Sequence, residues 1–87
     1  MSGRNKIRYQ RGKKLWQINN ILQKYGICVS YYEDNSIYFN ILFVQMKYHK
    51  FLLLTSFICN NGFNLYKFRE WDLDDLKIIL KQYNDLS

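Results

Sequence analysis

Apolar residues at helical spacing lie near both ends of the chain and enclose a central stretch rich in β-branched and aromatic residues. Within residues 15–25 they recur every three or four positions, and Gly26 follows, where a left-handed residue commonly ends a helix. Residues 73–83 repeat this spacing behind Asp72, a good N-cap. Each helix is apolar on one side only, so both ends of the chain should pack on a shared surface.

The central stretch predicts strands separated by turns. Turn-forming residues stand at 34–36 and at 60–62, and the second set contains Asn61-Gly62, a pair typical of a two-residue hairpin. The segments between them predict four strands, at 27–32, 37–48, 51–59 and 63–68. The expected fold is a single small α+β domain of order α-β-β-β-β-α, with both helices on one face of a four-stranded antiparallel sheet.

The excess of positive over negative charge is confined to the beginning of the chain. Residues 1–14 carry six cations and no acid, whereas residues 15–87 hold seven basic and seven acidic residues. Residues 1–12 also have few apolar side chains. We therefore expect a flexible basic arm at 1–12, followed by one domain at 13–87, with the arm approaching an acidic partner.

The second face of the predicted sheet is not polar. Residues 51–54 do not alternate between apolar and polar types, as a strand covered on one face would. The expected partner interface consists of Tyr38, Leu42, Val44, Leu52 and Leu54. A homodimer is the simplest cover for this surface, although the arm or the long second strand could also fold over it within one chain.

Catalytic chemistry finds little support in the sequence. His49 is the one side chain with an ordinary pKa near neutrality, and Cys28 and Cys59 do not have metal-ligand spacing. Nucleophile elbows and glycine-rich phosphate loops are absent. We therefore predict a binding protein and not an enzyme, with no catalytic residue, metal, cofactor or small-molecule substrate.

Three hypotheses about function remain open. The first is nucleic-acid binding through cations that follow phosphates without reading sequence. The expected contacts are Arg4, Lys6, Arg8, Arg11, Lys13, Lys14, Lys24, Lys47 and Lys50. The second is a small inhibitor or adaptor from a phage or mobile element, which binds a host nucleic-acid-handling or defence protein through the apolar sheet face. A ribonuclease toxin centred on His49 is the third.

The same composition bears on location. The longest strongly apolar run, residues 51–59, is too short to span a bilayer, and polar residues interrupt the stretch after the basic segment, so we expect no signal peptide. The sequence therefore predicts a cytoplasmic protein without a membrane partner.

Overall fold

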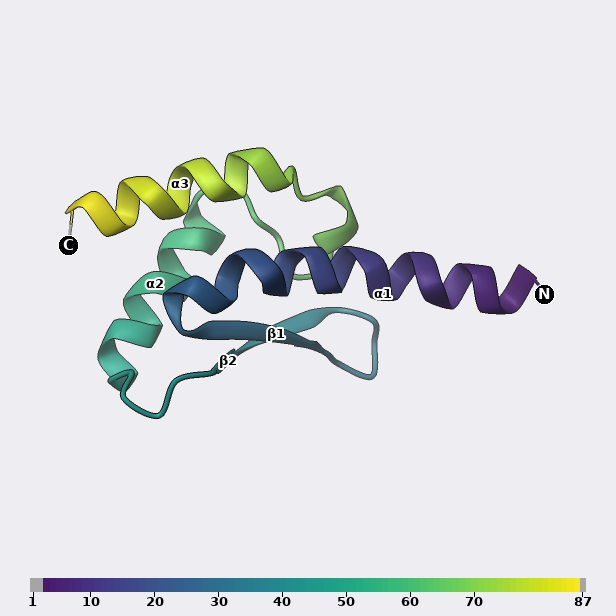
Figure 1. Cartoon of the computed structure of the whole chain (residues 1–87), viewed down its shortest axis with the longest axis horizontal. Coiled ribbons are helices and arrows are strands. Elements are labelled where there is room, and N and C mark those ends of the chain that lie inside the picture. Colours follow the sequence, from purple (N-terminus) through teal and green to yellow (C-terminus); the bar gives the residue numbers. More distant parts are fainter. Residues whose placement is uncertain (1–2, 87) are drawn as a thin grey trace.

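The computed structural model describes the backbone of residues 3–86 and the side chains of residues 12–86. Within that range the chain forms three α-helices and one antiparallel pair of strands. The elements are α1 (Gly3–Leu22), η1 (Gln23–Tyr25), β1 (Ile27–Tyr31), β2 (Ile37–Ile41), α2 (Tyr48–Asn60), η2 (Phe68–Glu70) and α3 (Leu73–Leu86). Figure 1 shows α1 between the β1–β2 hairpin and α3, and α2 packs against α3.

The predicted four-stranded sheet is wrong. The sheet has only the strands β1 and β2, paired with Ile27 opposite Ile41 and Tyr31 opposite Ile37. Residues 51–59 are helical and belong to α2, and residues 63–68 form turns that lead into η2. The molecule remains a small α+β fold, but it has three helices instead of two.

The error at residues 51–59 has a physical explanation. A continuous apolar run is compatible with a buried strand and with a buried helix, and this run contains no proline or glycine to exclude the helix. Its buried residues are Leu54, Thr55 and Ile58, and Phe51 is half-buried. Their spacing of three and four positions is that of one helical face, which packs towards α3.

The Asn-Gly pair therefore has a different role from the predicted hairpin. Asn61 follows the last turn of α2, and its backbone N–H donates to the Phe57 carbonyl at 3.2 Å. Gly62 has a φ of 91°, the left-handed conformation that commonly follows the end of a helix. The freedom of Gly62 to adopt a positive φ thus ends a helix here and connects no strands.

Several local predictions are confirmed. The helix expected at residues 15–25 is present as the C-terminal part of α1 together with η1, and Gly26 ends it with a φ of 84°. Residues 34–36 form the hairpin turn, in which the Ser36 backbone N–H and hydroxyl both donate to Asp34 Oδ1. Asp72 caps α3, because its Oδ1 accepts from the backbone N–H groups of Asp74 and Asp75.

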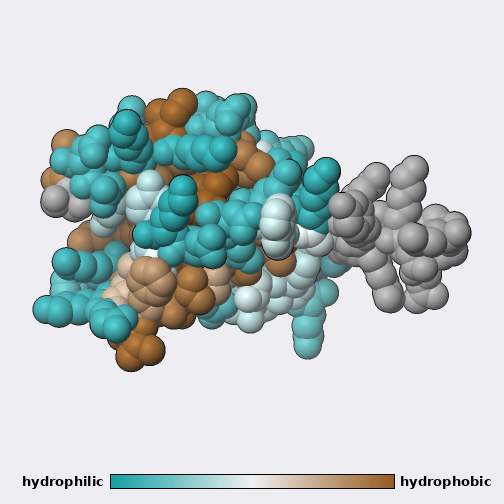
Figure 2. All heavy atoms as spheres, viewed as in Figure 1, coloured by the Kyte–Doolittle hydropathy of each residue, from teal (hydrophilic) through white to brown (hydrophobic). Residues whose placement is uncertain are grey.

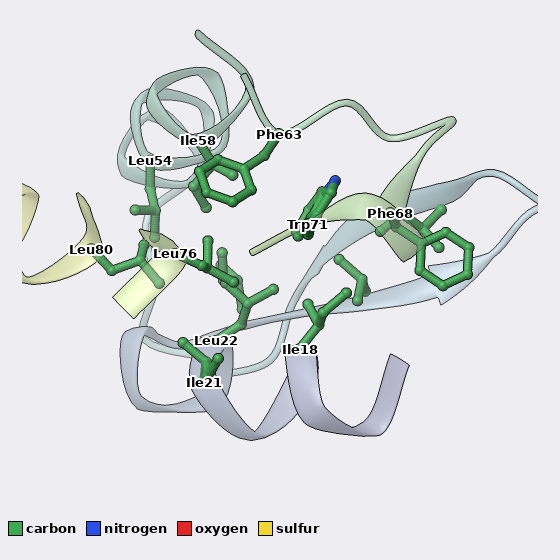
Figure 3. Packing of buried hydrophobic residues seen from close by; sticks show 13 residues of the cluster. Ile18, Ile21, Leu22, Leu54, Ile58, Phe63, Phe68, Trp71, Leu76 and Leu80 are labelled. Carbon is green, nitrogen blue, oxygen red and sulfur yellow. The ribbon is translucent and has the colours of Figure 1, made fainter. Parts of the chain in front are cut away.

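The core joins all these elements. Figure 3 shows side chains from α1, α2, α3 and the segment between α2 and α3 converging on one cluster. Its members are Ile18, Ile21, Leu22, Ile27, Val29, Ile37, Leu54, Ile58, Phe63, Phe68, Trp71, Leu76 and Leu80. Because α1 and α3 both bury residues in this cluster, they lie next to each other although they stand at opposite ends of the sequence.

The N-terminal segment has helical backbone from Gly3 onward as part of α1. Residues 3–12, which belong to the segment predicted to be an arm, therefore continue the backbone of α1 (Figure 1). The side chains of residues 1–11 lie outside those described. The division into an arm at 1–12 and a domain at 13–87 stays a prediction.

Candidate nucleic-acid interface

A groove of about 530 Å³ runs between α1 and α3. It is lined by Gln17, Asn20, Ile21, Lys24, Tyr25, Leu73, Lys77 and Lys81. The lining thus combines three lysines and two side-chain amides with a partly apolar floor. Such a surface offers positive charge and hydrogen-bond donors side by side, which is the chemistry that binds phosphate groups.

The groove follows from the way each helix buries its apolar face. On α1, Ile18 and Leu22 are fully buried, so the polar residues beside them face outward. On α3, Leu76 and Leu80 are fully buried, and the lysine after each of them lies at the groove. Residues four positions apart are neighbours on a helix, so the two α3 lysines stand one turn apart on the same side.

The groove lysines are available to a ligand. Lys24, Lys77 and Lys81 are exposed, and the described part of the chain provides neither an ion pair nor a hydrogen bond for them. The described lining contains no Asp or Glu. Asp74 stands three positions before Lys77 and Asp85 four positions after Lys81, but neither of them lines the groove. Within its described lining the groove therefore carries positive charge and no negative charge.

Two of the three acids of α3, Asp74 and Asp75, lie in its first turn, and the third, Asp85, lies in its last turn. A second groove of about 430 Å³ is lined by Asn61, Gly62, Phe63, Asn64, Lys67, Glu70, Trp71, Asp72 and Asp75. Asp72 is engaged as the N-cap, with Oδ1 3.0 Å from the Asp74 nitrogen and 3.1 Å from the Asp75 nitrogen. Charge along α3 thus changes from acidic in the first turn to basic in the middle, so a polyanion would approach the middle of α3 and avoid its start.

The structure describes the side chains of two of the six basic N-terminal residues, Lys13 and Lys14. Lys13 is exposed and stands one turn before Gln17 on the groove side of α1. Lys14 is half-buried, and its Nζ donates to the Trp71 carbonyl at 2.6 Å, so it fastens α1 to the segment before α3. The predicted contacts Arg4, Lys6, Arg8 and Arg11 lie outside the described side chains.

The remaining predicted contacts, Lys47 and Lys50, are exposed at the start of α2. They do not line the groove, and α2 begins beyond the hairpin side of α1, away from α3 (Figure 1). Of the nine residues predicted to bind nucleic acid, the structure places Lys24 in the groove and Lys13 beside it.

Sequence reasoning missed Gln17, Asn20, Lys77 and Lys81. The spacing of Lys77 and Lys81 was a signal that they share a helix side. Their approach to Lys24 depends on the packing of α1 against α3, which spacing along one helix does not reveal.

The residues predicted as a partner interface are separated by the structure. Leu54 is 3% exposed and belongs to the core, and Tyr38 is half-buried in the hairpin, with its ring 4.5 Å from that of Tyr32. Leu42 and Val44 are exposed in the connection between β2 and α2, and Leu52 is exposed on α2. The common sheet face assumed for them does not exist, because the sheet has two strands.

Exposed apolar side chains nevertheless gather in this region. In addition to Leu42, Val44 and Leu52, they include Tyr48 and Leu53 of α2, and Val44 is 96% exposed. Figure 2 shows hydrophobic residues at the lower left, where the connection between β2 and α2 lies. We call Leu42, Val44, Tyr48, Leu52 and Leu53 the apolar surface.

The described residues bring little reactive chemistry together. His49 is exposed in the first turn of α2, Cys28 is half-buried, and Cys59 is exposed, with both thiols free. Among the described residues no three His, Cys, Asp or Glu side chains are arranged to hold a metal ion. Hydrogen bonds from Ser36 lower the pKa of Asp34, an effect that the hairpin turn explains.

Two wider observations complete the description of the site. Within the described chain, every helix is too short or too polar to cross a bilayer. Comparison of the chain with protein-family models, with curated proteins and with solved structures gave no match.

Proposed function

We propose that the protein is a non-enzymatic binder of nucleic acid, acting in the cytoplasm. It engages the phosphate backbone through the basic segment at residues 1–14 and the lysines of the groove between α1 and α3. The observation that carries this proposal is the convergence of Lys24, Lys77 and Lys81 on one groove without a carboxylate in its described lining.

The charge distribution supports binding to the phosphate backbone of a nucleic acid without recognition of its bases. The basic segment at residues 1–14 leads along α1 to the groove, and Lys13 stands beside the groove, whereas Lys14 is bonded to the Trp71 carbonyl. Lysine is a flexible point charge that binds phosphate without fixing a base identity, and each neutralised phosphate releases condensed counterions. We therefore expect affinity that depends steeply on salt and weakly on nucleotide sequence.

The test compares two triple variants of equal charge. Lys24→Gln, Lys77→Gln and Lys81→Gln remove the groove cations, and Lys47→Gln, Lys50→Gln and Lys67→Gln remove three exposed cations outside it. Affinity for a fluorescent oligonucleotide is measured over a series of salt concentrations. The groove variant should weaken binding and make the log-log salt slope shallower by about 2 to 3. An equal effect of both variants would show that only net charge matters.

Removal of residues 1–12 tests the basic segment separately. The described core begins at Ile18, so the truncated protein should still unfold cooperatively, with a helical circular dichroism signal reduced by the part of α1 that is removed. Its affinity for nucleic acid should fall sharply at moderate salt, because most of the excess charge is lost. Full affinity after truncation would contradict a role of this segment.

A second candidate is contact with a protein through the apolar surface, either in a homodimer or in the inhibitor role predicted from the sequence. Exposure of Val44 and Leu53 at neighbouring parts of the chain favours it. Sedimentation should give a dimer mass for the wild type and a monomer mass for Val44→Asp. A wild-type monomer would leave only a different protein as the occupant of this surface.

A further inference from the structure

The indole of Trp16 is 64% exposed on α1, whereas the other tryptophan, Trp71, is 4% exposed. Trp71 has clear structural partners: its Nε1 donates to the Asn64 carbonyl at 2.8 Å, and its ring meets Phe63 edge to face. The structure records no ring contact or hydrogen bond for the Trp16 side chain within residues 12–86. Exposure of so large an apolar side chain forgoes roughly 1.5 to 3 kcal/mol of burial, so folding does not explain Trp16.

The neighbours of Trp16 on the helix surface are small, polar or basic. Residues three and four positions away are Gly12, Lys13, Asn19 and Asn20. Lys13 is exposed, and Asn20 lines the groove between α1 and α3. Trp16 therefore borders the basic groove and stands apart from the apolar surface, whose members lie in α2 and the connection before it.

These surroundings favour one of two partners that can bind an exposed tryptophan, a protein or a nucleic-acid base. A tryptophan at the centre of a protein interface is usually enclosed by other groups that exclude water. A tryptophan beside a lysine and at the edge of a basic groove has the composition of a stacking platform, on which a base lies while cations hold the adjoining phosphates. The neighbours of Trp16 match the second arrangement.

We infer that the protein binds unpaired nucleic acid in preference to duplex, with a base stacked on Trp16 and the adjoining phosphates near Lys13 and the groove lysines. Residues 13 and 24 are separated by about 16 Å along the helix, which leaves room for a short run of nucleotides. In a duplex the base faces are already stacked inside the helix, so only phosphates reach the protein. This inference rests on the proposed function and specifies its ligand.

The experiment uses the full chain with a short oligothymidylate and a mixed-sequence duplex of equal length. Binding of the single strand should quench the fluorescence of wild-type protein, because Trp16 is the exposed indole. Trp16→Phe should lose this quenching while it keeps most of the affinity, since phenylalanine still stacks and the buried Trp71 then provides the emission. Trp16→Ala should weaken single-strand binding about five- to hundredfold and change duplex binding less than about twofold.

Tyr66→Ala provides the matched control, because Tyr66 is an exposed aromatic outside the groove and should leave both affinities unchanged. If Trp16→Ala leaves single-strand affinity intact, Trp16 serves another partner, such as a protein, and the inference is overturned. Equal affinity for single strand and duplex would also overturn it while the proposed function stands. Absence of binding to either ligand at low salt would remove both.

Discussion

Asn19 of α1 and Val29 of β1 are joined by two hydrogen bonds: the Val29 N–H donates to Asn19 Oδ1 at 2.7 Å, and Asn19 Nδ2 donates to the Val29 carbonyl at 3.1 Å. The side-chain amide thus occupies the place of a neighbouring strand at the outer edge of β1. Since the sheet has only two strands, this contact satisfies backbone groups that would otherwise be unpaired.

We predict that Asn19→Ala lowers the free energy of unfolding by about 1 to 3 kcal/mol, because Val29 is buried and both of its backbone groups lose their partner. Asn20→Ala is the matched control, since Asn20 lines the groove and should change stability by less than about 0.5 kcal/mol. Urea denaturation measures both. Equal losses would contradict a specific role of the amide of Asn19.

Gly26 should be intolerant of a side chain. Its φ is 84°, and a Cβ atom there would lie 2.9 Å from Cδ2 of Phe43 and 3.1 Å from Cε of Met46. Gly26→Ala should therefore cost more than about 1 to 2 kcal/mol, from left-handed strain and from crowding. Gly12→Ala, in α1 with open space around it, should stabilise the protein by about 0.5 to 1 kcal/mol. Thermal unfolding of the two variants checks the opposite signs.

The pKa of Asp34 lies below its ordinary value of 3.8, because the side chain and then the backbone of Ser36 donate hydrogen bonds to its carboxylate. A lowered folded-state pKa means that this contribution to stability is present above the unfolded pKa and is lost as the pH falls through the folded pKa. Ser36→Ala should raise the pKa of Asp34, which NMR titration of the carboxyl can follow. The stability difference between variant and wild type should then shrink in acid below 3.8. An unchanged titration would show that the Ser36 hydroxyl does not determine the pKa.

Leu52 and Leu54 separate the helix from the strand predicted for residues 51–59. Two positions apart, they would share a face of a strand, but in α2 Leu52 is 44% exposed and Leu54 is 3% exposed. Leu54→Ala should cost about 2 to 5 kcal/mol, and Leu52→Ala less than about 1 kcal/mol. Chemical denaturation compares them, and similar losses at the two positions would favour the strand.

Turns, helix caps and helix ends could be predicted from the sequence, because each depends on residues that are close together in the chain. The left-handed Gly26, the turn at Asp34 and Ser36, and the cap at Asp72 each depend on a local side chain or on the freedom of glycine. Each is present in the structure because no distant part of the chain needs to cooperate for it to form.

Residues 51–59 could not be assigned in this way, since their apolar run suits either kind of element. Packing decides between them. Leu54 and Ile58 enter the core with Leu76 of α3, and the ring of Phe57 lies 5.1 Å from that of Tyr83. These contacts need one helical face opposite α3, and residues 3–86 hold no third strand that could extend the sheet.

The sequence by itself determined the apolar faces of the first and last helices, the turn and cap positions, and the concentration of positive charge before Leu15. Only the tertiary structure decided that α2 is a helix and that Lys24 shares a groove with Lys77 and Lys81. Helical spacing and capping act over a few residues, and a sequence displays them directly. The choice of which buried faces pack together is made by the whole core, and that choice brings the two ends of this chain to one surface.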